Sequence, residues 1–301
     1  MPLNEAIRQF IAWKGFASKE CTTKGYFLSL RQFAIFQRNG HIEEVSIKDV
    51  IEWFALMKQV DYERNSFIPK AMALRKLFEY YRRQDLQVLN PELIPVPEKE
   101  WKFPRVATEE NYKKLLAVIP ENNDPRHIRN RAMINLLWDT GARVGEIVSL
   151  NMSDIDMEKM QAVIRTEKSK GHRPVRQIFW TETTKASLEN WFAKREHLGG
   201  IMPRMDEQAL FISVNSQKSG KRLMSKSIEE SLRKYSRLAD TPYMNPHSFR
   251  HHMGHQIVAQ GGSNAVVSGI LGHSSPLSSF VYTMLNDEEL RSNHQRYARA
   301  I

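Results

Sequence analysis

The sequence contains a single cysteine, Cys21, among 301 residues, and this scarcity excludes several classes of protein. A lone thiol cannot form an internal disulfide or a multi-thiolate zinc site, which suits a reducing compartment. The N-terminal stretch, MPLNEAIRQFIAWKG, lacks the apolar core of a secretory signal peptide. No apolar run approaches the roughly 20 residues that a membrane-spanning helix needs. We therefore expect a soluble cytoplasmic protein with no membrane partner.

Acidic residues are in deficit, because 34 Asp and Glu face 44 Lys and Arg, leaving a formal net charge of +10. Such an excess favours a polyanionic partner, nucleic acid first and an acidic membrane surface second. The hydrophobic fraction of 41% and the charged fraction of 26% are typical of a globular protein rather than a disordered one. The length exceeds the usual size of one domain, so we expect two domains.

The first ninety residues have the periodicity of several short helices. Apolar side chains recur every three or four residues within the windows 26–34, 50–57 and 71–81. We therefore predict an N-terminal helical bundle over residues 1–90. Five basic residues accompany the third window, and for them both a contact with DNA phosphate and an ordinary solvated face stay open: Lys70, Arg75, Lys76, Arg82 and Arg83.

A proline-rich stretch follows this bundle. Residues 90–104 read NPELIPVPEKEWKFP, and four prolines in this stretch exclude a helix interior or a central strand. We predict an extended linker over residues 91–105 and a second domain over residues 106–301. The linker therefore marks the domain boundary.

The second domain is predicted to be mostly helical with a small antiparallel sheet inserted. Helical periodicity resumes beyond the linker, and Thr140–Gly141 marks one helix stop, since glycine is the usual C-cap residue. The period then changes to that of strands at Ala162–Arg165 and Val175–Trp180, with Leu210–Ile212 as the candidate third strand. The whole chain is therefore predicted to be mainly α.

A histidine-rich stretch, HSFRHHMGHQIVAQGG, begins at His247 and poses a choice between a metal site and a phosphate site. His251 and His255 have the spacing of a two-histidine zinc helix. The glutamate of the metalloprotease pattern is replaced by His252, and no well-spaced third ligand is found, so we expect no metal. A serine hydrolase is disfavoured as well, because Ser268 lacks the flanking glycine of a nucleophile elbow.

Phosphate fits the same stretch better. His247 and Arg250 are three residues apart, so both side chains leave one face of a helix and suit two oxygens of a phosphodiester. The segment TGARVGE places Arg143 after a helix stop, where a second guanidinium would neutralise transition-state charge. The segment LGHSS presents His273 at another helix end, and Tyr282 follows nine residues later. Arginines and imidazoles around one phosphate would activate a phenol, whose ordinary pKa is about 10.

The ordered set TGARVGE, HSFR, LGHSS and a following tyrosine resembles the tyrosine recombinase (phage integrase) family. Within that family the chain is most similar to the two-domain Xer-type site-specific recombinases, and the resemblance covers essentially the whole chain. It implies a SAM-like core-binding domain followed by a catalytic domain of the DNA breaking–rejoining fold. The two domains would form a C-shaped clamp around duplex DNA.

The resemblance also implies a role for each matched residue. Arg143 and Arg250 would hold the scissile phosphate, and His247 would help to position it and manage the proton of the nucleophile. His273 would donate a hydrogen bond to a non-bridging oxygen. Tyr282 would attack, forming a 3′-phosphotyrosyl link and freeing a 5′-hydroxyl.

Two further roles follow from the family pattern. The family uses a lysine in a β-hairpin turn as general acid, and this chain reads RTEKSKGHR there, so Lys168 is preferred and Lys170 is the second choice. Glu146 matches an acidic position that supports the arginine turn, with a surface ion pair as the alternative. Because a phosphotyrosine conserves the bond energy, rejoining needs neither ATP nor a metal, and no cofactor is expected.

The implied function is site-specific DNA strand exchange through a Holliday junction. The family acts as a tetramer on two DNA sites, so we expect a homo-tetramer, or a hetero-tetramer with a related recombinase, at the nucleoid. Residues 286–301 would make subunit contacts or pack on their own domain. Two alternatives stay open, a type IB topoisomerase-like or telomere-resolving enzyme and a DNA-binding protein that has lost catalysis.

Overall fold

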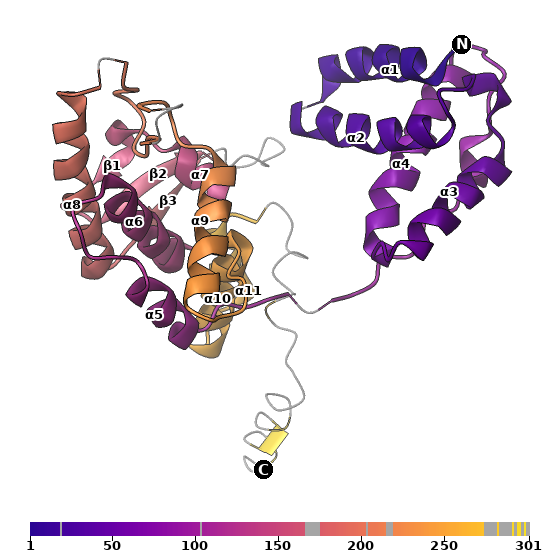
Figure 1. Ribbon diagram of the computed structural model, residues 1–301. Helices are drawn as coiled ribbons and strands as arrows, with labels where there is room; N and C mark the ends of the chain where they lie inside the picture. The colour runs from indigo at the N-terminus through magenta and orange to yellow at the C-terminus, as the bar shows by residue number, and fades with distance from the viewer. Residues whose placement is uncertain are drawn as a thin grey trace. The chain divides into compact units, whose positions relative to one another are not determined.

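The computed structural model describes residues 1–18, 20–102, 104–165, 175–202, 204–214 and 219–273, together with Tyr282, Arg291, His294, Gln295 and Ala298 (Figure 1). The chain divides into two compact units, Met1–Phe103 and Pro104–Ile301. Each unit has a hydrophobic core of its own. No helix within these described ranges is long and apolar enough to cross a membrane.

The N-terminal unit is a helical bundle. Its elements are α1 (Leu3–Ala17), α2 (Glu20–Phe36), the 3-10 turn η1 (Ile42–Glu44), α3 (Ile47–Gln59), η2 (Arg64–Ser66), α4 (Phe67–Arg82) and η3 (Pro91–Leu93). Helices α1 and α2 lie side by side, and α4 packs against both (Figure 1). The core combines aliphatic side chains with aromatic ones, among them the fully buried Phe10, Phe33 and Phe78. The periodicity of the sequence therefore reflects one shared core.

The proline-rich stretch begins inside this unit. Ile94 is fully buried in the N-terminal core, and its carbonyl accepts a hydrogen bond of 2.8 Å from Nε of Arg75 on α4. Prolines exclude a regular helix or strand here but do not prevent burial, because η3 turns the chain back onto α4. The structure thus places the first part of residues 91–105 against the bundle.

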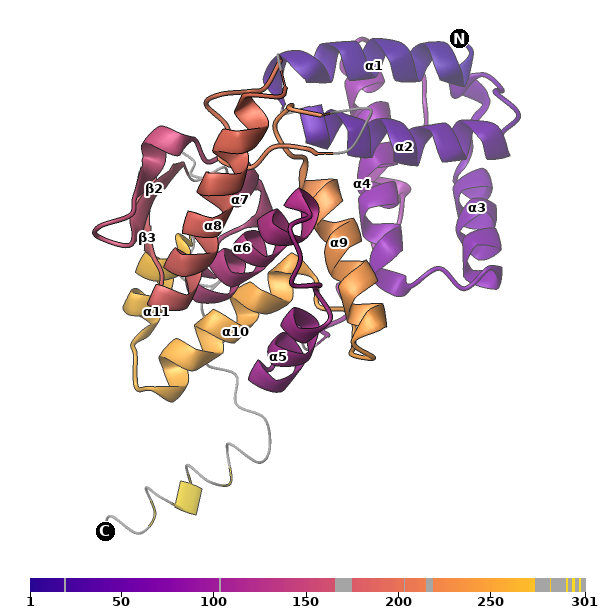
Figure 2. The same cartoon turned by 60° about the vertical axis from the view of Figure 1, so that its left-hand side comes forward.

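The C-terminal unit has more elements and contains the sheet. Its elements are α5 (Glu109–Ala117), α6 (Pro125–Thr140), α7 (Val144–Ser149), η4 (Met152–Asp154), β1 (Ile155–Asp156), β2 (Gln161–Arg165), β3 (Val175–Phe179), α8 (Glu182–Gly199), α9 (Ser225–Leu238), α10 (Pro246–Ala259) and α11 (Asn264–Leu271). Helix α6 lies against both α8 and α10 (Figure 2). The predicted fold class, mainly helical with a small antiparallel sheet, is confirmed.

The sheet has the order β1-β2-β3, with every pair antiparallel. The two predicted strands are β2 and β3, but the prediction of a third strand at Leu210–Ile212 was wrong, because β1 fills that place. Leu210–Ile212 is fully buried, as its apolar residues suggest. Side chains satisfy two of its carbonyls, since Trp191 donates to Leu210 at 2.8 Å and Arg129 donates to Ile212 at 2.9 Å. The carbonyl of Phe211 accepts from the backbone N–H of Leu223 at 2.9 Å, in an isolated bridge rather than a strand.

Two glycines end helices where the chain must turn. Gly141, the C-cap of α6, has a φ of 55°, and Gly272, the C-cap of α11, has a φ of 66°. Both values lie in the left-handed region that favours glycine. A Cβ at Gly141 would also lie 2.9 Å from Cβ of Met253 on α10. These turns bring the ends of α6 and α11 close to α10, and each is followed within two residues by a predicted catalytic side chain.

Candidate active site

Helix α10 supplies the arginine at the centre of the site. Arg250 is buried, and its guanidinium donates to the carbonyl of Gly141 at 3.1 Å and to that of Leu271 at 2.6 Å. These carbonyls belong to the C-terminal ends of α6 and α11, where the helix dipole favours a positive charge. Arg250 therefore fixes the ends of two helices around its own position.

The segment TGARVGE supplies a second arginine and the carboxylate that holds it. Arg143 is the N-cap of α7, and its backbone N–H and Nη1 donate to Glu146 at 2.9 and 3.0 Å. Glu146 is 0% exposed, so the alternative of a surface ion pair is wrong. The carboxylate is buried between two guanidiniums, because Nη2 of Arg176 also donates to it at 2.8 Å.

Arg176 on β3 is the site residue that the sequence reasoning missed. Besides Glu146, it binds the carbonyl of Ile270 near the end of α11 at 2.7 Å. It therefore ties the sheet to α7 and α11. A signal was present, because side chains alternate along a strand and Arg176 shares its face with Ile178, which is buried. An arginine on the inward face of a predicted strand calls for a buried partner.

Tyr282 lies against the same group of side chains. Its side chain is 3% exposed, and its ring centroid is 5.5 Å from that of His251, 5.7 Å from that of His255 and 5.8 Å from that of His273. The rings of His273 and Tyr282 are nearly parallel, at 4°. The guanidinium of Arg250, which holds the helix ends, lies close enough to the phenol to oppose the rise in its pKa.

The site has an excess of positive charge. Three guanidiniums lie near one carboxylate, Glu146, which pairs with Arg143 and Arg176, while Arg250 binds two carbonyls. Burial, with the charge of Arg143 adding to it, lowers the pKa of Arg250 to about 10. Buried cations with too few carboxylates favour a bound anion. A phosphodiester, with one negative charge and two non-bridging oxygens, suits such a group of cations.

Burial and the nearby guanidiniums also shift the pKa values of the imidazole of His273 and the phenol of Tyr282. Burial, and then the charges of Arg250 and Arg143, lower the pKa of His273 to about 4. Burial raises the pKa of Tyr282, while the charge and hydrogen bond of Arg250 oppose this rise. At neutral pH His273 is therefore a neutral hydrogen-bond donor and Tyr282 a protonated phenol. Among the described residues, no three His, Cys, Asp or Glu side chains are grouped to hold a metal ion.

The other predicted site residues are placed as follows. His247 lies exposed on the first turn of α10, one turn from His251, whose pKa its charge helps to lower. Lys168 and Lys170 lie outside the described residues, as does most of the segment 286–301. The structure thus brings Arg143, Arg250, His273 and Tyr282 together, and the role of each in catalysis stays a prediction.

The five basic residues that accompany the window 71–81, which the structure shows to be α4 and its C-cap, have partners within their own unit. Lys70 is 8% exposed, with its ammonium hydrogen-bonded to Gln32 and placed over the rings of Trp53 and Tyr62. Arg75 holds the backbone at Ile94. The remaining three make side-chain pairs near the surface, Lys76 and Arg83 with Glu79 and Arg82 with Asn90. A DNA contact by these five stays a prediction.

Acidification is expected to destabilise the C-terminal unit through two histidines. Burial lowers the pKa of His251 and of His273 to about 4, below the usual value of about 6.5. Between these pH values the unfolded chain binds more protons, so stability falls as the pH drops from 6.5 towards 4. Discounted for partial exposure, each ring contributes about 1 kcal/mol, or about 2 to 4 °C in Tm. Thermal unfolding at pH 7.5 and pH 5 should therefore show a smaller fall in Tm for His251→Asn than for the parent, and an equal fall would contradict this.

Comparison with known proteins places this geometry in a family. The phage integrase family profile matches residues 105–289. The chain is 28% identical to tyrosine recombinase XerC of Staphylococcus saprophyticus over 276 residues, 90% of this chain and 89% of that protein. It is 27% identical to tyrosine recombinase XerD of Vibrio vulnificus over 303 residues, 97% of this chain and 94% of that protein.

A solved structure supports the same conclusion at the level of fold. The Tn1549 transposon integrase, solved in complex with transposon right end DNA, superposes with a TM-score of 0.71 at 20% identity. The likeness covers 99% of this chain and 100% of that one. The family match itself extends over more than half of the sequence. The chain therefore belongs to the phage integrase family of tyrosine recombinases.

Proposed function

We propose that this protein is a site-specific DNA recombinase that cuts and rejoins duplex DNA through a 3′-phosphotyrosyl intermediate. One observation carries the proposal: the buried ring of Tyr282 stacks on His273, and the charges of Arg250 and Arg143 act on both rings. These residues come from segments far apart in the chain. A group of guanidiniums beside a phenol suits an attack on a phosphodiester.

The chemistry follows from the positions of these groups. Arg143 and Arg250 bind the non-bridging oxygens and neutralise the charge that develops on them in the transition state, with His273 donating a further hydrogen bond. The oxygen of Tyr282 loses its proton, with His247 managing it, and forms a bond to phosphorus. The bond from phosphorus to the 5′ oxygen breaks, and that oxygen takes a proton from Lys168 or Lys170.

Rejoining reverses the same step. A 5′-hydroxyl from the partner DNA attacks the phosphotyrosine, and the oxygen of Tyr282 leaves and regains its proton. Because each step exchanges one phosphoester bond for another, no energy cofactor enters. Two rounds of exchange produce and resolve a Holliday junction.

The proposed partner is double-stranded DNA, bound by a tetramer of this chain, or of this chain with a related recombinase, on two sites. The N-terminal domain, residues 1–90, would contribute DNA contacts, residues 91–105 the connection, and residues 286–301 contacts between subunits. The net charge of +10 supports a polyanionic partner. We place its activity in the cytoplasm, at the nucleoid.

The proposal is tested by trapping the covalent intermediate. The protein is incubated with a duplex that carries a binding site selected from random-sequence DNA and a nick beside the cleavage position, so that the freed fragment diffuses away. We expect the parent to accumulate a covalent protein–DNA adduct, and Tyr282→Phe to form none while still binding the duplex. Absence of an adduct with the parent, or an undiminished adduct with Tyr282→Phe, would reject the proposal. Relaxation of a supercoiled plasmid without any selected site would instead favour a topoisomerase-like enzyme.

The general acid is identified by a substrate that does not need one. With normal DNA, alanine at the acid position should slow cleavage at least about 10²-fold. In a 5′-bridging phosphorothioate the leaving sulfur requires no proton. We therefore expect this substrate to restore the rate of Lys168→Ala to nearly that of the parent, with Lys170→Ala as the matched comparison. Rescue of Lys170→Ala alone would assign the role to Lys170, and rescue of neither would exclude both lysines.

A further inference from the structure

Gly254 occupies the interior of α10, a position where glycine has a cost. Glycine stabilises a helix less than alanine, because its unfolded backbone has more freedom to lose. Its backbone angle gives no reason for glycine, since Gly254 is not among the residues with positive φ. Gly254 is buried, and it lies one turn beyond Arg250 on the same helix. What glycine provides at this position is space.

The ring of Tyr282 fills that space. A Cβ at Gly254 would lie 2.6 Å from both Cδ1 and Cε1 of Tyr282 and 2.8 Å from its Cγ. Carbon atoms pack at roughly 3.5 to 4.0 Å, so any side chain here would push the whole ring away by about 1 Å. His251 and His255, which flank Gly254 on α10, lie beside the same ring. The ring thus rests on the bare backbone of the helix between two imidazoles.

We propose that Gly254 is the seat of the nucleophile, a positioning residue that lets the ring of Tyr282 approach α10 closely enough for its oxygen to reach Arg250. This inference rests on the proposed function, in which that oxygen attacks phosphorus. Arg250 and the seat belong to one helix, so the distance between the guanidinium and the phenol is set by α10 itself. A displacement of about 1 Å at a reacting atom is enough to cost about 10²-fold in rate.

Gly269 provides a matched control. It lies within α11 of the same unit and is exposed, and a Cβ there would have no atom within 4 Å. Alanine should therefore favour the helix at both positions, but only at Gly254 should it meet the ring of Tyr282.

The first experiment measures single-turnover adduct formation on the nicked duplex at saturating DNA. For Gly254→Ala we expect a rate about 10²-fold below that of the parent, an unchanged Kd for DNA and a Tm equal to or above that of the parent. For Gly269→Ala we expect an unchanged rate. A residue needed only for the stability of the fold would lower Tm together with the rate. A Gly254→Ala rate within about threefold of the parent, or above it, overturns the inference.

The second experiment needs no activity, so it separates this inference from the proposed function. Thermal unfolding is measured for the parent, Gly254→Ala, Tyr282→Ala and the double variant. Tyr282→Ala should lower Tm when Gly254 is present, because the buried ring is lost, and should lower it less in Gly254→Ala, where the displaced ring has already lost part of its packing. Additive changes in Tm would mean that Gly254 does not position the ring of Tyr282. Non-additive changes in a protein that forms no adduct would support this positioning role and reject the recombinase function.

Discussion

Replacement of Arg143 by alanine is expected to slow cleavage at least about 10³-fold while leaving DNA affinity nearly unchanged. The guanidinium neutralises charge that grows on the phosphate in the transition state, and one such arginine accounts for about 10³- to 10⁵-fold in phosphoryl transfer. DNA affinity comes mainly from many other phosphate contacts. The fold should tolerate the change, because Glu146 keeps its bond of 2.8 Å to Arg176. Adduct formation and DNA binding are measured on the same duplex.

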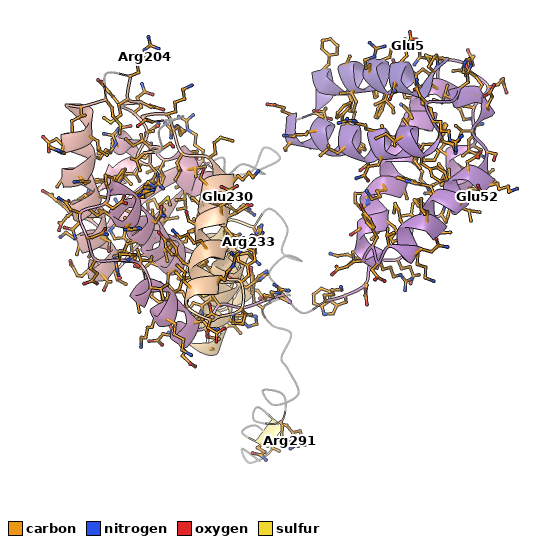
Figure 3. The ribbon with its side chains drawn as sticks, viewed as in Figure 1. Glu5, Glu52, Arg204, Glu230, Arg233 and Arg291 are labelled. Atoms are coloured by element: carbon orange, nitrogen blue, oxygen red, sulfur yellow. The ribbon has the colours of Figure 1, made fainter. Side chains whose placement is uncertain are left out.

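Two controls make this result specific. A duplex whose scissile phosphate is a neutral methylphosphonate carries no charge to neutralise, so on it the deficit of Arg143→Ala should shrink. Arg204→Ala removes an exposed arginine from the same unit and should leave cleavage unchanged (Figure 3). If Arg143→Ala lost binding and cleavage in the same proportion, Arg143 would be a general DNA anchor.

Loss of the charge on Glu146 should produce the largest change in stability. Glu146→Gln removes both ion pairs of a fully buried carboxylate and leaves Arg143 and Arg176 facing each other without a counter-charge. Breaking a buried pair in this way costs about 3 kcal/mol, so we expect Tm to fall by about 6 to 12 °C. The measurement is thermal unfolding at neutral pH.

The matched control for Glu146 is an exposed ion pair in the same unit. Glu230 lies on α9, where its side chain is 65% exposed and 3.8 Å from Lys226 (Figure 3). Because water screens such pairs, Glu230→Gln should change the free energy of unfolding by less than about 0.5 kcal/mol. Equal losses in the two variants would mean that the buried carboxylate does not hold the arginines.

Several helices and two of the three strands were predictable because their signals are local. Apolar spacing places α2, α3 and α4, and glycine marks the left-handed stop at Gly141. The third strand was misplaced because β1 has only two residues, too few for a period, while Leu210–Ile212 is an apolar run that is buried without becoming a strand. A short apolar segment has the same sequence pattern whether it pairs as a strand or is buried without strand pairing.

Only the site residues that belong to the ordered sequence motifs were predictable. Arg143, Arg250, His273 and Tyr282 each follow a recognisable local pattern, and the structure brings them together. Arg176 has its partner 30 residues away, so strand alternation places its side chain on the inward face of β3 but does not reveal that it binds Glu146.

The environment of the basic residues in the N-terminal unit could not be predicted from local sequence either. Lys70 belongs to a basic cluster in the sequence, yet tertiary contacts bury its charge against two aromatic rings and Gln32. A cluster of like charges is visible in the sequence, but its exposure is decided by helices packed from elsewhere in the chain.

The most direct test of the account is to identify the chemical bond between protein and DNA. The trapped adduct is digested with a protease, and mass spectrometry locates the nucleotide on the peptide while end-labelling determines the DNA polarity. We expect a 3′-phosphate joined to the oxygen of Tyr282 and a free 5′-hydroxyl on the released strand. A nucleotide attached to any other residue, or a link to a 5′-phosphate, would contradict it.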